Sequence, residues 1–279
     1  MIPGTVPAHA VPAAPSAGTI EPMLDKRLRW GGLAWLLTLQ FFVAETIAQL
    51  RFGGGYSRAD DVISDLGASY SPAAGLMNAS FVLQGVLIAA GALLLRPALP
   101  RAAGRLAVAL LIVAAVGVVV VGIVPLDANR TVHAVGAVAH LTGASLGMLA
   151  LAHTLRPRSE VVGSVIAVLG LVSTAASIFF FAGITRFLGE GGTERAAAYA
   201  LPVALALAGV TLWRGGPEAA GADGPSRREL RARDREQQRA EAAAQAAERD
   251  VALERYAADQ EPKDDADEDP WAPSNRRDD

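Results

Sequence analysis

Cysteine is absent from the sequence, and this excludes disulfides, thiolate metal ligands and cysteine nucleophiles. The sequence also has no phosphate-binding P-loop, no glycine-rich dinucleotide fingerprint and no His-Glu-x-x-His motif of zinc proteases. Charge is scarce as well: charged residues make up 19% of the chain, and most of them lie from Arg214 onward. The formal net charge of −3 therefore averages an apolar core with a polar tail, and it indicates nothing about partners.

Long apolar stretches dominate the rest of the sequence. Hydrophobic residues make up 52% of the chain, and six stretches each approach the roughly 20 residues that a helix needs to cross a bilayer. Short charged loops separate them, which predicts an all-α, polytopic membrane protein with a bundle of six transmembrane helices. The sixth stretch is short and contains Pro202. The predicted spans are approximately Trp30–Leu50, Ala73–Leu95, Gly104–Val124, Val132–Thr154, Val161–Ile184 and Ala196–Trp213.

Lysine and arginine residues near the span ends predict the orientation of the bundle. They are more frequent on one side of the bundle, which comprises the segment before the first span, the loops after the second and fourth spans, and the segment after the sixth. They are less frequent in the loops after the first, third and fifth spans, which lie on the other side. We therefore expect a multi-pass protein of the cell membrane with both termini in the cytoplasm. The first set comprises Lys26, Arg27, Arg29, Arg96, Arg101, Arg105, Arg156, Arg158, Arg214, Arg227 and Arg228, and the second comprises Arg51, Arg58, Arg130, Arg186 and Arg195.

The chain divides into a leader (residues 1–25), a membrane domain (residues 26–214) and a cytoplasmic region (residues 215–279). The leader is rich in Ala and Pro and has no apolar core with a cleavage site, so we expect a disordered segment rather than a secretory signal. Translation from Met23 is an alternative to translation from Met1.

The cytoplasmic region changes character along its length. After a linker, Ser226–Ala258 is dense in Arg, Glu, Ala and Gln, and its first residue stands in capping-box spacing with Glu229. This predicts a solvated helix, with a weak coiled coil as the alternative. From Asp259 onward the chain is acidic and contains proline, which predicts a disordered tail.

Polar residues in the predicted spans lie mainly toward the outer leaflet. Glu45, Asn78 and His133 fall at similar depth on three spans, and His140 lies near the middle of the fourth. A charge at the centre of a spanning helix costs at least about 2.5–3.5 kcal/mol, so these groups are expected to face the bundle. The two histidines are seven residues apart and so share one helix face, about 10 Å apart along the axis. Gly143-x-x-x-Gly147 on the same span permits close helix approach.

The loop after the first span brings further carboxylates to the same side. Asp60, Asp61 and Asp65 fall within six residues, among glycines and aromatic residues, and Asp127 precedes the fourth span. The sequence therefore predicts a polar pocket in the outer half of the bundle. Its candidate residues are Glu45, Asp61, Asp65, Asn78, Asp127, His133 and His140, of which we expect Glu45, Asp65, Asn78 and His133 to form one constellation.

These positions also carry a family resemblance. Ser64-Asp65-Leu66-Gly67, Met77-Asn78-x-Ser80-Phe81, a glycine at Gly85 and Gly122-x-x-Pro125 leading to His133 follow one another at matching topological positions. In these features the chain resembles the bacterial and archaeal family catalogued as domain of unknown function 998, over roughly Leu33 to Trp213. The resemblance implies a six-span integral membrane protein and no particular chemistry.

A metal site and a haem site are the two cofactor sites that the polar residues suggest, and each has a simpler alternative. Carboxylates with a histidine suit a divalent metal or general acid–base chemistry on a lipid headgroup, but Asp127 or Asn129 also suits an ordinary helix cap. Haem between two histidines requires two facing spans, whereas His133, His140 and His153 all lie on one. We therefore expect neither a resident metal nor a cofactor.

Three functions remain open at this level. The favoured one is binding or modification of a lipid-like ligand in the polar pocket, with membrane lipids as partners. The alternatives are a small solute or proton transporter, and a scaffold whose cytoplasmic tail recruits a protein. Nucleic-acid binding is not expected, because the basic residues of Arg227–Arg239 alternate with acidic ones.

Overall fold

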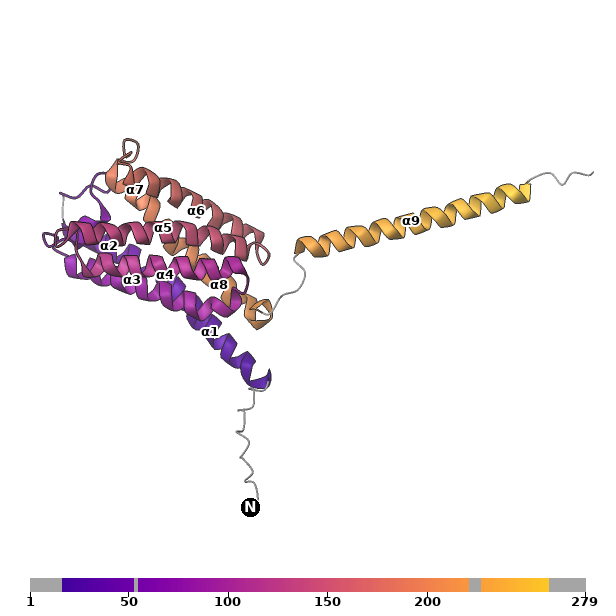
Figure 1. Cartoon of the computed structure of the whole chain (residues 1–279), viewed down its shortest axis with the longest axis horizontal. Coiled ribbons are helices and arrows are strands. Elements are labelled where there is room, and N and C mark those ends of the chain that lie inside the picture. The colour runs from indigo at the N-terminus through magenta and orange to yellow at the C-terminus, as the bar shows by residue number, and fades with distance from the viewer. Residues whose placement is uncertain (1–16, 53–54, 221–226, 261–279) are drawn as a thin grey trace, which may run out of the picture. The chain divides into compact units, whose positions relative to one another are not determined.

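The computed structural model describes residues 17–52, 55–220 and 227–260, and they form helices joined by turns (Figure 1). No β-strand occurs in these ranges, and the predicted all-α class is confirmed. The elements are α1 (Ala17–Leu37), α2 (Gln40–Phe52), the 3-10 helix η1 (Ile63–Gly67), α3 (Ala74–Leu95), the 3-10 helix η2 (Arg96–Ala98), α4 (Ala102–Ile123), α5 (Arg130–Leu155), α6 (Glu160–Phe181), α7 (Gly189–Ala198), α8 (Ala200–Ala220) and α9 (Arg227–Gln260).

Some of the predictions fall at the edges of these ranges. Helix α1 begins at Ala17, inside the segment that the sequence assigns to the leader, and α8 extends to Ala220, inside the predicted linker. The predictions for residues 1–16, for residues 221–226 with the cap at Ser226, and for residues 261–279 lie outside the described residues.

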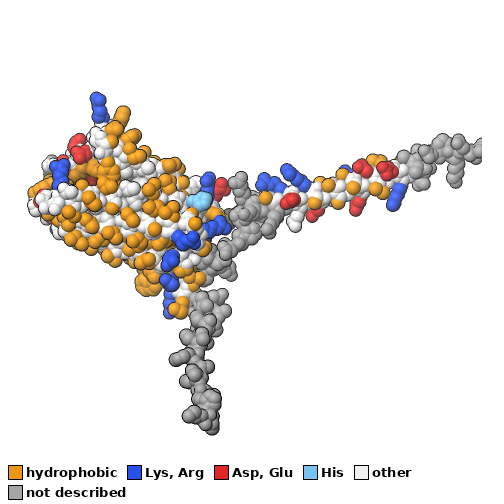
Figure 2. Space-filling view, in the orientation of Figure 1, with side chains coloured by type: hydrophobic (Ala, Val, Ile, Leu, Met, Phe, Trp, Pro, Cys, Tyr) orange, Lys and Arg blue, Asp and Glu red, His pale blue; other side chains and the backbone are white. Residues whose placement is uncertain are grey.

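Within the described ranges, six helical segments are long and apolar enough to cross a membrane, as the sequence predicts. Large apolar side chains are exposed along their flanks, including those of Val116, Val135 and Leu171. Figure 2 shows this apolar surface on the face of the bundle that is turned to the viewer. Exposed apolar flanks of this kind suit a lipid environment, so the chain is a multi-pass membrane protein. The six segments are Met23–Phe52, Ala74–Ala98, Ala102–Ile123, Arg130–Leu155, Glu160–Phe181 and Gly189–Gly215.

The last span begins earlier than predicted. It starts at Gly189 instead of Ala196, because α7 continues into α8 after a break at Tyr199. Pro202 explains the break, since it has no N–H to donate to the carbonyl four residues earlier and its ring crowds that carbonyl. The extension places Glu194 and Arg195 on a helix of the bundle instead of in a loop.

The first span is broken as well, at Thr38 and Leu39 between α1 and α2. There the backbone bonds run to the third preceding residue, and the Thr38 hydroxyl donates to the carbonyl of Trp35 at 2.6 Å. The same hydroxyl lies 3.4 Å from the carbonyl oxygen of Pro202. The breaks in the first and last spans are therefore neighbours.

Successive spans pack side by side, α3 on α4, α4 on α5 and α5 on α6, while α1 closes the bundle against α3 and α8. The α4–α5 contact is close because glycines face it. A Cβ added to Gly143 would lie 2.7 Å from the carbonyl oxygen of Leu110, and one added to Gly136 would lie 2.9 Å from that of Gly117. The small-residue pattern on α5 thus brings this helix, with its histidine face, against α4.

The two ends of the bundle differ in composition. At one end, called the polar end, α2, α4 and α6 finish, and η1 in the segment 55–73 contacts α2, α3 and α7. The opposite end, called the basic end, is marked by lysines and arginines, which Figure 2 shows gathered there. Its basic residues are Lys26, Arg27, Arg29, Arg96, Arg101, Arg105, Arg156, Arg158 and Arg214.

The chain separates into two compact units, Met1–Gly224 and Pro225–Asp279. Within the second unit α9 is a single helix, and every one of its side chains that the structure describes is exposed. Exposure of these side chains in a single chain is compatible with both the solvated helix and the coiled coil that the sequence leaves open.

Replacement of Gly91 by alanine is expected to destabilise the bundle. The added Cβ would overlap the indole ring of Trp35, which is fully buried and donates to the carbonyl of Ile88 at 3.2 Å. Overpacking of this kind costs about 1–3 kcal/mol, so Gly91→Ala should lower the Tm of the purified protein in detergent. Gly75→Ala on the same helix is the control, because no atom lies within 4 Å of its added Cβ. Equal Tm values for the two variants would contradict this account of the α1–α3 contact.

Candidate functional site

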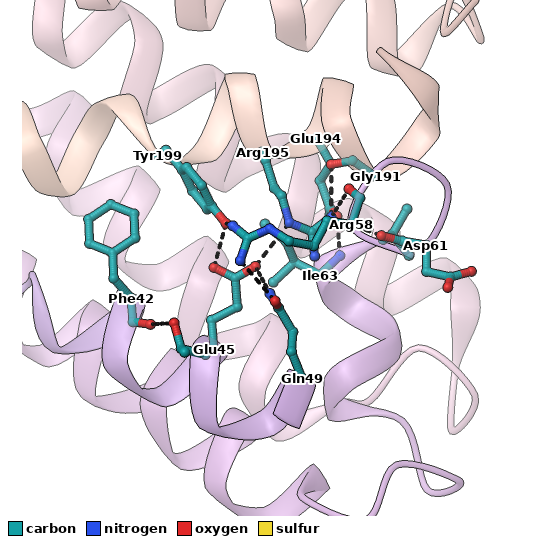
Figure 3. A network of polar contacts seen from close by, with 12 residues as sticks. Phe42, Glu45, Gln49, Arg58, Asp61, Ile63, Gly191, Glu194, Arg195 and Tyr199 are labelled. Carbon is teal, nitrogen blue, oxygen red and sulfur yellow. Dashed lines mark hydrogen bonds and ion pairs between the residues drawn. The ribbon is translucent and has the colours of Figure 1, made fainter. Parts of the chain in front are cut away.

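A buried arginine organises the polar end of the bundle. Arg195 on α7 is only 5% exposed, and its Nε donates to Glu45 Oε1 on α2 at 3.0 Å. Its Nη1 donates to the carbonyl oxygens of Arg58, Asp61 and Gly191 at 2.8, 2.9 and 3.0 Å. Figure 3 shows these contacts converging from α2, α7 and the loop after α2. A buried guanidinium requires such partners, because desolvation without them costs several kcal/mol.

Tyr56, Tyr199 and Gln49 complete this set of contacts, and together with Arg195 and Glu45 they are called the Arg195 network. Tyr199 Oη and Gln49 Nε2 both donate to the Glu45 carboxylate at 2.7 Å, so both of its oxygens are occupied. Tyr56 accepts from Arg195 Nη2, and its ring lies 5.5 Å from the guanidinium carbon. Burial raises the pKa of Tyr56 to about 12, although the neighbouring guanidinium acts in the opposite direction. Tyr56 therefore stays a neutral phenol at physiological pH.

A second polar chain, called the Glu194 chain, lies beside the first. Glu194 accepts a hydrogen bond from the backbone N–H of Ile63, and its Oε1 lies 3.3 Å from the Ser64 hydroxyl. Ser64 Oγ in turn lies 3.0 Å from His133 Nε2 on α5. His133 Nδ1 lies 2.8 Å from the carbonyl oxygen of Val124. This chain connects α7, η1 and α5 through the half-buried side chain of Glu194 and the buried side chains of Ser64 and His133.

A cavity of about 50 Å³ lies inside the bundle next to the Glu194 chain. Ser64, Gln84, His140 and Glu194 contribute polar groups to its wall, and the remaining lining is apolar. A space of this size holds a few water molecules or a small group of a larger ligand. The apolar lining residues are Phe41, Ile63, Phe81, Val118, Val121, Ala137, Leu141, Ala198 and Pro202.

Gln84 presents a free amide donor among these groups. Gln40 Nε2 lies 3.3 Å from the carbonyl oxygen of Ser80, which only accepts, so this atom is the amide nitrogen. The same nitrogen donates to Gln84 Oε1 at 3.3 Å, which fixes the orientation of the second amide. Gln84 is 3% exposed, and its Nε2 has no hydrogen-bond partner among the described residues.

Three of the predicted pocket residues, Glu45, His133 and His140, lie in three different parts of the site. Glu45 lies in the Arg195 network, His133 in the Glu194 chain and His140 at the cavity. The carboxylate that His133 reaches through the Ser64 hydroxyl belongs to Glu194 and not to Glu45. The structure thus places Glu45 and His133 in two separate networks, whereas the sequence favours one constellation.

His140 is held against the neighbouring helix. Its Nδ1 lies 2.9 Å from the carbonyl oxygen of Ala114 on α4, while its ring contributes to the cavity wall. The ring is thus tied to the bundle at one nitrogen, and α4 and α5 meet at this depth.

Two of the acidic candidates stabilise the loop after α2. Asp61 Oδ2 accepts from the backbone N–H of Ser57 at 2.6 Å, and Asp65 accepts from the Tyr70 hydroxyl at 2.6 Å. Burial and this carboxylate together raise the pKa of Tyr70 to about 12. Both carboxylates therefore have structural partners within the loop itself.

Asp127 and Asn78 tie the loop to the bundle. Asp127 accepts from the backbone N–H and the hydroxyl of Ser69, and the hydroxyl bond holds the pKa of this carboxyl below its usual range. Asn78 Nδ2 donates to the carbonyl of Gly67 at 2.8 Å, and a Cβ on that glycine would overlap Asn78 Oδ1. This Oδ1 is buried and has no partner among the described residues.

Asn129, and not Asp127, caps the fourth span. Its side chain accepts from the backbone N–H of Val132 at 3.1 Å, at the start of α5. The sequence leaves both residues open as the cap, and the structure assigns the role to Asn129.

Sequence reasoning missed Glu194, Arg195 and Tyr199 as site residues. The run Gly191-Gly-Thr-Glu-Arg195 reads as a polar loop, and the apolar pattern becomes visible only from Ala196 onward. One signal was available: the predicted sixth span was shorter than the others, and extending it toward its N-terminus brings two charged residues into the bundle.

Six apolar spans around a buried ion pair and a partly polar cavity define a multi-pass helical membrane protein. The chain belongs to the family described as Protein of unknown function (DUF998), whose family model matches residues 36–211. This confirms the resemblance noted from the sequence. No curated protein and no solved structure matches the chain.

Loss of the Arg195 guanidinium is expected to destabilise the protein severely. Arg195→Met leaves the Glu45 carboxylate buried without a cation, and breaking a buried pair in this way costs about 3–5 kcal/mol. Glu45→Gln also leaves a buried charge without its counter-ion, but it should cost less, because three backbone carbonyls and Tyr56 still accept hydrogen bonds from the guanidinium. The double variant should cost less than the sum of the two single variants, since both remove the same interaction.

The measurement is the Tm of each variant in one detergent. Arg186→Met is the control, because Arg186 is exposed at the same end of the bundle. Strictly additive losses in the double variant would show that Glu45 and Arg195 do not stabilise one another.

Proposed function

We propose that the protein binds a lipid-like molecule, and that the cavity beside the Glu194 chain receives the polar part of this ligand. The observation that carries the proposal is the Gln84 amide nitrogen, which has no partner among the described residues and belongs to a wall that is otherwise mostly apolar. The buried atoms without a partner among the described residues are Asn78 Oδ1 and Ser177 Oγ, so the Gln84 nitrogen instead borders the cavity, where a carbonyl oxygen of a ligand would accept its hydrogen bond. Mixed walls of this kind favour an amphiphilic ligand over a strongly hydrated one.

The size of the cavity limits which part of the ligand enters it. About 50 Å³ accommodates a small group and not a whole lipid, so the ligand's chains would remain outside the bundle. Glu194 in the wall disfavours a negatively charged group, and the Arg195 guanidinium is already occupied by Glu45. The group that fits best is therefore neutral and carries a carbonyl oxygen.

We also propose that the protein lies in the cell membrane with its polar end outside and both termini in the cytoplasm. The basic end supports this orientation, because lysines and arginines are retained on the cytoplasmic side. The cavity would then lie in the half of the bundle that belongs to the outer leaflet. Recruitment of a cytoplasmic protein by the exposed α9 helix stays an alternative proposal, as does transport.

Single cysteines test this orientation, since the chain has none of its own. Arg186→Cys at the polar end should react with a membrane-impermeant maleimide in whole cells. Arg101→Cys at the basic end should react only after lysis, and both positions are exposed. The reverse pattern would overturn the orientation, and labelling of both in intact cells would overturn the topology.

Filling the cavity is expected to displace the ligand. Ala137→Val adds two methyl groups to the lining, and it should reduce the lipid that native mass spectrometry detects with the purified protein. Ala134→Val is the matched control on α5, because Ala134 is exposed on the flank of the bundle. If both variants retain the same lipid as the wild type, the cavity is not the binding site.

A further inference from the structure

We propose that Ser64 and His133 form a nucleophile–base pair that cleaves a carboxylic ester of the lipid-like ligand. The inference rests on the proposed function, because that function brings the ester carbonyl into the cavity. Ser64 lines the cavity, whereas His133 lies behind it, away from the lining. This is the order that nucleophilic catalysis requires, with the hydroxyl facing the substrate and the base facing the hydroxyl.

Hydrogen bonding fixes the tautomer of His133. Its Nδ1 lies 2.8 Å from the carbonyl oxygen of Val124, and a carbonyl oxygen only accepts. Nδ1 therefore carries the proton, and in the neutral ring Nε2 has its lone pair toward Ser64 Oγ at 3.0 Å. A base oriented by a third group, within reach of a hydroxyl, is the arrangement that activates serine.

Glu194 positions the serine. It accepts from the backbone N–H of Ile63 and lies 3.3 Å from Ser64 Oγ, so it holds the start of η1 against α7. The contact to His133 is the shorter of the two contacts made by the hydroxyl. The hydroxyl has a single proton, which it can donate either to Glu194 Oε1 or to His133 Nε2. Transfer to the imidazole starts from the second orientation, while the bond from the Ile63 N–H to Glu194 keeps the serine backbone in place.

Gln84 supplies the donor that an acyl-transfer site needs. Its Nε2 is unpartnered among the described residues, and it belongs to the same cavity wall as Ser64. As the carbonyl carbon becomes tetrahedral, its oxygen gains negative charge that a preorganised N–H stabilises. The amide is already held by Gln40, so little reorganisation is required.

The reaction balances with water as the only co-reactant. Ser64 Oγ forms a bond to the acyl carbon and its proton moves to His133 Nε2. The bond to the alcohol oxygen then breaks, and that oxygen takes the proton from His133. Water attacks the acyl-serine in the same way, which releases the carboxylic acid and restores both residues.

A second serine provides a contrast. Ser145 stands in a Gly-x-Ser-x-Gly sequence, but it lies inside α5, where its hydroxyl contacts the carbonyl of Leu141 at 2.7 Å and Ser173 Oγ at 2.9 Å. A nucleophile elbow requires a strand-to-helix turn, and no hydrogen bond joins Ser145 to a histidine in the described part of the chain. Ser145 is therefore a matched control.

The test uses the full-length protein in detergent and a fluorophosphonate with a long alkyl chain. Its phosphorus forms a bond to the attacking serine oxygen and loses fluoride, which gives a stable mass increase. Peptide mapping of the wild-type protein should place this mass on Ser64. Ser64→Ala should abolish it, Ser145→Ala should retain it, and His133→Gln should slow it by roughly 100-fold or more.

Wild-type mapping decides the question even if a variant fails to fold. No phosphonate on Ser64, in protein that still retains its lipid, would overturn the pair and leave the proposed pocket intact. Phosphonate on Ser64 would support the nucleophile–base pair. If the Ala137→Val variant nevertheless retained as much lipid as the wild type, the proposed lipid pocket would be refuted independently of the pair. A purely structural role for Ser64 would produce no labelling at all.

Discussion

The buried pair of Arg195 and Glu45 is the constraint on which the polar end depends. Nearly all donors of the guanidinium are used: one on the carboxylate, one on a tyrosine and the others on backbone carbonyls of the loop after α2 and of α7. Arg195 directly follows Glu194 on α7. The contacts that hold the Arg195 side chain in place therefore also determine the direction in which the Glu194 side chain leaves the helix. The position of Ser64, and with it the wall of the cavity, follows from this arrangement.

The apolar helices were predictable because their signal is local. Each of the six spans is a continuous run of residues, and its length alone indicates a membrane helix. The end of a span is less certain, as α7 shows: its Gly, Thr, Glu and Arg residues have the composition of a loop, and only packing against the bundle makes them helical. Tertiary contacts prevailed there over local composition.

The site was only partly predictable, because its pairs are far apart in the sequence. Depth along a span indicated correctly that Glu45 and His133 would be buried. Depth does not indicate which residue lies opposite, however, and Arg195 is separated from Glu45 by 150 positions. Nothing in the sequence around Ser64 marks it as the partner of His133; only the folding of η1 over the bundle brings them together.

The paired breaks in the first and last spans have a mechanical consequence. Each interrupts the regular backbone ladder of its helix, and the contact between Thr38 and Pro202 places the breaks next to one another. Beyond them, α2 and α7 are joined by the Arg195–Glu45 pair. Helices bend most readily where backbone hydrogen bonds are missing. Bending of the bundle is therefore expected at this level, and the ion pair between α2 and α7 couples the two helices beyond it.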